Sequence, residues 1–234
     1  MKPVAFITGM QREAQCLDAL TRYLPADQRP YIQCAGPGPE RAAIACEHIE
    51  KRCISGIASI GFAGGLDPAL AAGTILVPSA VISDQNQLIE TDSKWQAHLA
   101  AALSSKPPTT LQMGVDTAIT NVTEKEMLFQ EYKAHAVDME SHIIGKFAKE
   151  RGLPFILIRV VADTANDAIP KAALAGLNNT GSILPFQVIR QLISNPTQIP
   201  ALFQLVRDSK AAINSLKTIP RTAIEVLCRT KVVD

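Results

Sequence analysis

The segment Gly56-Ile57-Ala58-Ser59-Ile60-Gly61-Phe62-Ala63-Gly64-Gly65 decides how this chain folds. Apolar side chains run through its first half without the alternation of a strand that has one wet face. Such a run predicts a strand that is buried on both faces of a sheet. The strand ends in glycines, and open α/β sheets bind their ligands beyond the carboxyl ends of strands. The segment therefore predicts a buried strand and a sheet edge at which a site belongs.

Other apolar runs predict further strands at residues 4–8, 31–35, 74–82, 111–120, 136–139 and 155–162. The run at 74–82 is rich in β-branched residues and is the strongest strand prediction. Residues 83–93 are polar and predict a loop. Helical patterns lie between the strands: one follows Thr8-Gly9-Met10-Gln11, which has capping-box spacing, and others cover 39–52, 95–103, 124–132 and 140–151.

This alternation predicts an α/β fold in which a mostly parallel sheet carries helices on both faces. We expect a single domain over residues 1–234. From residue 168 onward the pattern is helical and is interrupted by prolines, so we expect residues 168–234 to form a helical C-terminal cover rather than a second domain.

The composition excludes several classes of function. The 234 residues carry 23 Lys+Arg against 22 Asp+Glu, and a net charge of +1 disfavours a nucleic-acid partner. The 5 cysteines are scattered without a C-x-x-C pair, and the 4 histidines contain no H-x-x-x-H, so we expect no disulfide framework, metal or cofactor. The chain shows no signal-peptide pattern and no apolar run of membrane-spanning length. We therefore expect a soluble, cytoplasmic protein.

Charged residues gather where predicted strands end. Glu13 follows the first strand, Glu140 follows the run at 136–139, and Arg159 and Asp163 lie at the end of the last strand. Three acids and one arginine at one edge of a sheet are able to supply a general acid, a general base and a sugar clamp.

These strand ends resemble the purine nucleoside phosphorylase and nucleosidase family over residues 4 to about 167. The resemblance is carried by four motifs in order: Gly9-Met10-Gln11-Arg12-Glu13; Gly61-Phe62-Ala63-Gly64-Gly65-Leu66-Asp67-Pro68 with Gly73-Thr74-Ile75-Leu76-Val77-Pro78; Val137-Asp138-Met139-Glu140; and Arg159-Val160-Val161-Ala162-Asp163. It implies a three-layer αβα fold with a central, twisted, mostly parallel mixed sheet. It also implies cleavage of a ribose–base N-glycosidic bond.

The resemblance also implies a role for each acid. Asp163 stands where the family keeps the aspartate that protonates, or hydrogen-bonds to, N7 of the leaving purine. Glu13 matches the glutamate that orients and deprotonates the attacking water. Glu140, with Met139 beside it, matches the residues that grip the ribose. Arg159 is expected to steady these carboxylates or the nucleophile.

Two further sets of residues follow from the resemblance more loosely. We expect Ala118 and Ile119 to bind the purine together with Asp163. The nucleophile pocket is expected to consist of Gly9, Phe62, Ala63 and Gly64.

Two departures bear on the nucleophile. The family's hexameric phosphorylases hold phosphate with an arginine near the position of Ser59 and a serine at the position of Phe62. Their absence, together with the presence of Glu13, favours water over phosphate. Nucleosidases also usually have serine where Phe62 stands, and Ala162 replaces the serine before the acid, so phosphorolysis stays an alternative.

The group that the chain resembles most is the hopanoid-associated phosphorylases, which remove adenine from adenosylhopane. Asp138-Met139-Glu140-Ser141, Phe62 and the long tail carry this likeness. It implies a nucleoside with a bulky apolar 5′ group and a homo-oligomer of at least two chains. Apolar tail residues then either pack as helix faces on the core or form a patch for peripheral membrane contact, with basic residues as anchors. The apolar candidates are Leu174, Leu177, Ile183, Leu184, Phe186, Val188, Ile189, Ile199, Leu202, Phe203 and Leu205.

Structural interpretations stand beside these roles. Glu13 also suits a first helical turn, Asp163 a turn, and Asp138 a helix N-cap, which we take to be its role. Gly36-Pro37-Gly38 imitates part of a dinucleotide fingerprint but predicts a turn. A non-catalytic nucleoside-binding relative and a Rossmann oxidoreductase remain the alternative functions. The acids argue against the first, and the missing fingerprint against the second.

Overall fold

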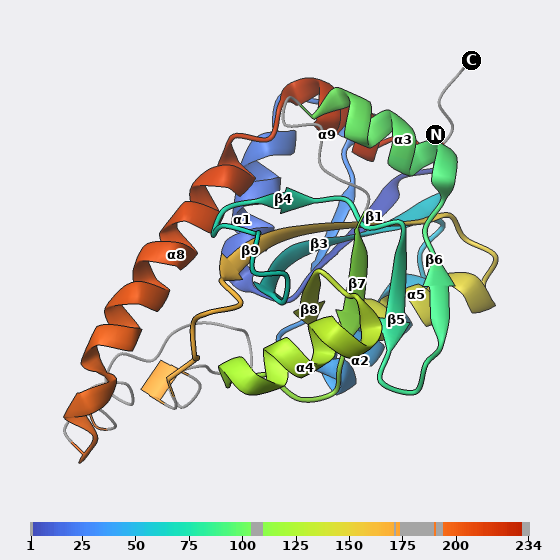
Figure 1. The fold of residues 1–234 in the computed structure, drawn as a ribbon. Coiled ribbons are helices and arrows are strands. Elements are labelled where there is room, and N and C mark those ends of the chain that lie inside the picture. The colour runs from blue at the N-terminus through green and yellow to red at the C-terminus, as the bar shows by residue number, and fades with distance from the viewer. Residues whose placement is uncertain (1, 104–109, 171, 174–189, 191–193, 231–234) are drawn as a thin grey trace.

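The fold is an α/β sandwich in which one mixed sheet lies between two layers of helices (Figure 1). It comes from a computed structural model that describes residues 2–103, 110–170, 172–173, 190 and 194–230. The sheet order along the main path is β2-β1-β3-β8-β7-β5-β6, and β9 pairs with β3 and with β4. The predicted fold class is confirmed.

The strands are β1 (Val4–Thr8), β2 (Tyr31–Cys34), β3 (Gly56–Gly65), β4 (Ile75–Leu76), β5 (Ala80–Ser83), β6 (Leu88–Glu90), β7 (Leu111–Gly114), β8 (Ala136–Asp138) and β9 (Phe155–Asp163). β1 runs parallel to β2 and β3, β3 to β9, and β7 to β5 and β8. The pairs β3–β8, β4–β9 and β5–β6 are antiparallel.

Both faces of the central strands are buried, as their continuous apolar runs predict. In β1, Val4 and Phe6 pack in one core cluster, whereas the alternating residues Ala5 and Ile7 pack in another. The first cluster lies under α1 (Gln11–Thr21), α3 (Ser93–Ala102), α8 (Ile199–Lys217) and α9 (Arg221–Leu227). The second lies under α2 (Pro39–Glu50) and α5 (Ser141–Glu150). The sheet is therefore covered on both sides, and α4 (Val122–Tyr132) packs over β7 and β8 through a third cluster that holds Met113 and Val137.

Two strand predictions are wrong in extent. The run at 74–82 splits into β4 and β5, which have different partners, around Pro78, which has no N–H to offer a ladder. The run at 111–120 forms a strand only as far as Gly114. The polar stretch 83–93 contains β6, an edge strand whose exposed Leu88 and Glu90 flank the buried Ile89.

The start of α1 is also corrected. Its N-cap is Met10 rather than Thr8, and the Glu13 carboxylate reaches back to the Met10 N–H. The helical prediction for residues after 168 is confirmed for α8 and α9, which pack on the first core cluster. The tail residues 174–189 lie outside the described residues, and the single-domain boundary stays a prediction.

Two findings concern membrane-spanning helices and metal sites. Among the helices of the described ranges, none is long and apolar enough to cross a membrane. In the same part of the chain, no group of three or more His, Cys, Asp or Glu side chains is placed to hold a metal ion.

Candidate active site

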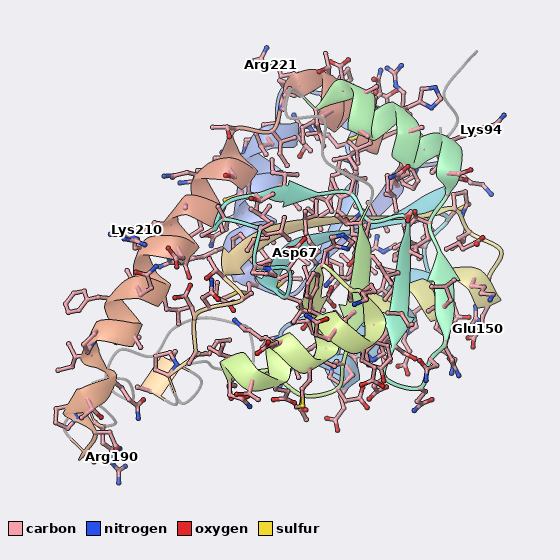
Figure 2. All side chains as sticks on the ribbon, viewed as in Figure 1. Asp67, Lys94, Glu150, Arg190, Lys210 and Arg221 are labelled. Carbon is pink, nitrogen blue, oxygen red and sulfur yellow. The ribbon has the colours of Figure 1, made fainter. Side chains whose placement is uncertain are left out.

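The predicted acids meet around the carboxyl end of β3. Glu13 follows β1, Glu140 follows β8, and Asp163 ends β9, and each of these strands pairs with β3. Asp67, labelled in Figure 2, lies just beyond the end of β3 and marks this edge of the sheet. Glu13 and Asp163 are buried, and Glu140 is largely covered.

Glu13 is held by backbone donors on both of its oxygens. Its Oε1 accepts from the Phe62 N–H at 2.7 Å, and its Oε2 accepts from the Met10 N–H at 2.7 Å. Burial raises the pKa of Glu13 to about 7, although these N–H groups and the charge of Arg159 act to lower it. The group therefore titrates near neutral pH, where a carboxylate is most useful as a general base.

The approach of Glu13 to β3 requires a glycine in the strand. A Cβ on Gly61 would lie 2.9 Å from Glu13 Oε1, which is closer than side chains approach one another. Gly61 pairs with Arg159 in β9, so the strand itself has no room to shift aside.

Glu140 lies between two glycine-containing turns. Its Oε1 accepts from the Gly38 N–H at 2.6 Å, and Gly9 lies against its carboxyl group. Gly38 has φ +100°, a conformation that favours glycine. Burial raises the pKa of Glu140 to about 7, the neighbouring Asp138 and Glu13 raise it further, and Gly38 and Arg159 oppose them. The turn predicted at Gly36-Pro37-Gly38 thus serves to hold the predicted ribose-binding acid.

Asp138 positions Glu140 through hydrogen bonds to the start of α5. Its Oδ1 accepts from the backbone N–H groups of Glu140 at 2.9 Å and Ser141 at 2.7 Å. The N-cap of α5 is Glu140 rather than Asp138, so the predicted cap position is wrong, but these hydrogen bonds give Asp138 a structural role. Its Oδ2 accepts from Arg159 Nε at 2.7 Å and from Gln112 Nε2 at 2.9 Å. Both carboxylate oxygens of Asp138 are therefore used in hydrogen bonds within the fold.

Arg159 does not contact the predicted catalytic carboxylates. Its guanidinium donates to Asp138, to Ser59 Oγ at 2.8 Å and to the Ile158 carbonyl at 2.9 Å. Its charge nevertheless lowers the pKa of both Glu13 and Glu140. The expected steadying of these carboxylates is electrostatic and indirect, so Arg159 acts as a positioning residue.

Asp163 is paired with a lysine that the sequence analysis did not single out. Lys125, from α4, places Nζ 2.5 Å from Asp163 Oδ2, and its side chain is fully buried. Burial raises the pKa of Asp163, and the Lys125 ammonium opposes that rise. A Cβ on Gly64 would lie 3.1 Å from Asp163 Oδ2, so β3 also approaches this acid through a glycine.

Gly61 and Gly64 therefore mark two positions, or stations, along β3. The first lies beside Glu13 and the second beside Asp163. At a rise of about 3.3 Å per residue, the stations lie roughly 10 Å apart along β3. Glu140 lies on the Glu13 side, since Gly9, which comes just before the start of α1, lies against its carboxyl group.

Several of the other predicted site residues place their side chains in or against core clusters. Ile119 is buried in a core cluster with Val137, and Met139 packs against the same cluster. Ala63 places its methyl group in another cluster, away from the carboxylates. The Phe62 side chain packs on the first core cluster, and only its backbone N–H faces Glu13.

Of the remaining predicted pocket residues, Gly9 lies beside Glu140 and Gly64 beside Asp163, and Ala118 is half-buried in the segment after β7. The structure adds Lys125 and Gly38 to the site. A lysine in an amphipathic helix and a glycine in a turn carry no sign of such roles in the sequence.

Comparisons with known proteins identify a family and a fold. The family model described as the phosphorylase superfamily matches residues 8–181. No curated protein matches the sequence.

Solved structures share the fold at low sequence identity. The 5′-methylthioadenosine/S-adenosylhomocysteine nucleosidase of Neisseria meningitidis, in complex with methylthio-immucillin-A, is 16% identical with a TM-score of 0.70, covering 97% of this chain and 98% of that one. A mutant of the Helicobacter pylori nucleosidase with 5′-methylthioadenosine in its active site is 14% identical with a TM-score of 0.67, over 94% and 98%. The futalosine hydrolase of Helicobacter pylori is 15% identical with a TM-score of 0.64, over 92% and 96%.

We expect the free energy of unfolding to fall as pH rises from about 4.5 to about 7. Glu13 keeps its proton in the folded state up to about pH 7 but loses it near 4.5 when unfolded. Ionising it costs roughly 3 kcal/mol across that window. Urea unfolding at stepped pH should show a shallower decline in Glu13→Gln, and an unchanged decline in the exposed control Glu47→Gln. Equal pH dependence in all three proteins would contradict the assignment.

We expect Gly61→Ala to displace the Glu13 carboxylate and free the Phe62 N–H, because the new methyl group would lie 2.9 Å from Oε1. Hydrogen exchange at the Phe62 amide should accelerate by about tenfold or more. Gly64→Ala is the matched control, since its methyl group meets Asp163 instead. An unchanged Phe62 amide in Gly61→Ala would show that Glu13 does not hold it.

Proposed function

Because the chain belongs to the phosphorylase superfamily, we propose that it cleaves the N-glycosidic bond of an adenine nucleoside, with water as the nucleophile. The observation that carries the proposal is the convergence of Glu13, Glu140 and Asp163 on one strand end, with Glu13 held by two N–H groups. A site that only bound nucleosides would not need a buried carboxylate that titrates near neutral pH.

Glu13 is the general base of the proposed reaction. Each of its oxygens already accepts one N–H, and each keeps a further lone pair for a water hydrogen. With a pKa of about 7, it is about half ionised at neutral pH and largely ionised above it, and it takes a proton as water attacks C1′ of the ribose. A positioned base of this kind contributes roughly 10² to 10⁴ in rate.

Glu140 is the proposed ribose clamp. One oxygen accepts from Gly38. The other has no partner among the described residues and is left to accept from a ribose hydroxyl. A carboxylate at the sugar stabilises the positive charge that develops on the ribosyl group as the bond to the base breaks. Asp138 and Arg159 fix the backbone from which Glu140 projects.

Asp163 is the proposed partner of the leaving base. The purine departs with the electron pair of the C1′–N9 bond, and protonation at N7 neutralises the charge that it would otherwise carry. Asp163 lies beside Gly64, three residues further along β3 than Gly61, which Glu13 approaches.

Water is favoured over phosphate by the surroundings of Ser59. Its hydroxyl is buried and accepts from Arg159, so it is not available at the nucleophile position. Phe62 contributes a backbone N–H there, and that donor is used by Glu13. A phosphate-dependent cleavage that yields ribose 1-phosphate is the second candidate, because the superfamily includes phosphorylases by name.

We propose adenosylhopane, or another adenosine with a bulky apolar 5′ group, as the substrate. The support is the Asp138-Met139-Glu140-Ser141 variant, Phe62 and the long tail. The Helicobacter pylori relative that was solved with 5′-methylthioadenosine also takes an adenine nucleoside modified at the 5′ position.

The described part of the tail supports peripheral membrane contact as a companion proposal. Ile199, Phe203 and Val206 are 40%, 72% and 43% exposed, and they recur along α8 at helical spacing. Lys210 projects from the same helix, as Figure 2 shows, with Arg207 exposed nearby. Asp208 is the one acid in α8 and is buried, so the exposed charges of this helix are positive. The homo-oligomer stays a prediction.

We expect the protein to release adenine from adenosine, and faster from a 5′-alkylated adenosine, without added phosphate. Asp163→Asn and Glu140→Gln should each abolish release while circular dichroism and melting temperature stay close to those of the parent. Chromatography of base and sugar products checks this. Release that requires phosphate and yields ribose 1-phosphate would refute hydrolysis, and near-normal rates in either variant would refute its assignment. Binding of the nucleoside without any release of adenine would refute the proposed enzymatic activity.

We expect the protein to sediment with vesicles of anionic phospholipid more than with zwitterionic ones, because apolar and basic side chains share α8. Phe203→Ser should reduce sedimentation several-fold. Ile44→Ser is the matched control, since Ile44 is 51% exposed on α2, which covers the other face of the sheet. Equal loss in the two variants would contradict a role for α8.

A further inference from the structure

Lys125 is the most unusual residue near the site. It projects from α4, and none of its side chain is exposed. Its Nζ lies 2.5 Å from Asp163 Oδ2, 2.7 Å from the Thr164 carbonyl and 2.8 Å from the Asp167 carbonyl. Burying a lysine without partners is costly, so three close acceptors around one amine indicate a built arrangement.

The three acceptors define the protonation state of this lysine. An ammonium group has three N–H donors and no lone pair, and each donor here has its own acceptor. A neutral amine beside an ionised Asp163 would leave one acceptor unsatisfied in the protein interior. The three contacts are therefore satisfied when the pair holds one proton, written here as a Lys125 ammonium beside an Asp163 carboxylate.

An ionised Asp163 is at odds with its proposed role, because a carboxylate only accepts hydrogen bonds. The leaving purine needs a proton at N7. Asp163 Oδ2 is taken by Lys125, and the other oxygen has no hydrogen-bond partner among the described residues. One oxygen of the carboxyl group thus contacts Lys125, and the other is left to accept a hydrogen bond from a ligand.

We infer that Lys125 and Asp163 act as one acid, in which Lys125 stores the proton that the leaving base takes and Asp163 passes it on. The inference rests on the proposed glycosidic cleavage. Lys125 touches no reacting atom and acts through Asp163, so it is a positioning residue.

The step balances. As the C1′–N9 bond breaks, its electron pair stays with the purine, and water supplies hydroxide to C1′ and a proton to Glu13. The Nζ–H bond of Lys125 breaks as Asp163 Oδ2 takes this proton, the carboxyl group rotates about its Cβ–Cγ bond to turn the O–H toward the base, and that O–H bond breaks as an N7–H bond forms. Lys125 is left neutral and Glu13 protonated. After adenine departs, transfer of one proton through solvent restores both groups.

Other charged groups around the pair bear on its titration. Asp167 follows β9, and its carboxylate accepts from the Thr164 hydroxyl at 2.5 Å, while only its carbonyl meets Lys125. Asp208 is buried on α8 and accepts from Gln204 at 2.9 Å. The negative charges of Asp167 and Asp208 both raise the pKa of Asp163. If Lys125 is removed, the one proton of the site therefore resides on Asp163.

The first test is the pH profile of adenine release by Lys125→Met. In the parent Lys125 supplies the proton of the pair, whereas in the variant the proton has only the Asp163 carboxyl group on which to reside. We expect the alkaline limb of kcat/KM to move down by at least one pH unit, with a rate loss of about 10² at pH 8. An unmoved limb would reduce Lys125 to a structural role, and a limb that moves up would show that it opposes protonation. Either outcome overturns the inference.

Lys125→Arg is the second variant, for use also if Lys125→Met unfolds. Arginine keeps the charge and the donors but does not release a proton in proteins. A structural ion pair would be restored by arginine, whereas a proton store would not. We expect a melting temperature near that of the parent and a rate at least about 10²-fold lower, and parental rates would overturn the inference.

A binding measurement separates this inference from the proposed function, because it needs no turnover. The probe is 9-deazaadenine, whose N7 carries a hydrogen and so requires a carboxylate acceptor. Its affinity for the parent should be constant between pH 5 and 8, while Lys125→Met should bind progressively more weakly as Asp163 takes up its proton at lower pH. The same pH dependence in both proteins would overturn the inference. Probe binding by a protein that releases no adenine would refute the proposed function alone.

Discussion

The buried ion pair between Arg159 and Asp138 holds the candidate site in place. Arg159 Nε lies 2.7 Å from Asp138 Oδ2, and both side chains are almost wholly excluded from water. The pair joins the middle of β9 to the end of β8, and hydrogen bonds link it to β3 through Ser59 and to β7 through Gln112. Breaking such a pair by removing one partner leaves an uncompensated buried charge and costs several kcal/mol. The strand ends are thereby tied together at the place where the acids project.

The acids themselves are set by a competition between burial and hydrogen bonding. Burial disfavours the charged forms of Glu13 and Glu140, while backbone N–H groups and the distant charge of Arg159 favour them. The result is two carboxylates that titrate at about pH 7 rather than 4.5. Asp163 differs because it has an ammonium in contact. The sheet thus carries two carboxylates that titrate near neutral pH and a third that is paired with an ammonium group.

Much of this architecture was predictable because local patterns carry it. Continuous apolar runs identified β1, β3 and β9, since strands buried on both faces have no polar side to show. Glu13 and Asp163 were found because the ends of parallel strands meet at one edge of a sheet, whereas Glu140 follows β8, which runs antiparallel to β3. The run at 74–82 misled because β-propensity does not reveal a change of partner at Pro78. Met139 and Ile119 were placed in the site by likeness, and the structure packs both against a core cluster.

The order of apolar runs and the acids at their ends were enough to establish an α/β sheet and the edge that bears its chemistry. Those features repeat locally along the chain, with a period that one segment can show. The partner of each acid depended on contacts across the fold. Lys125 lies 38 residues before Asp163, and Gly38 lies 102 residues before Glu140. No local pattern encodes such distances, and burial, which shifts each pKa, exists only after the layers close.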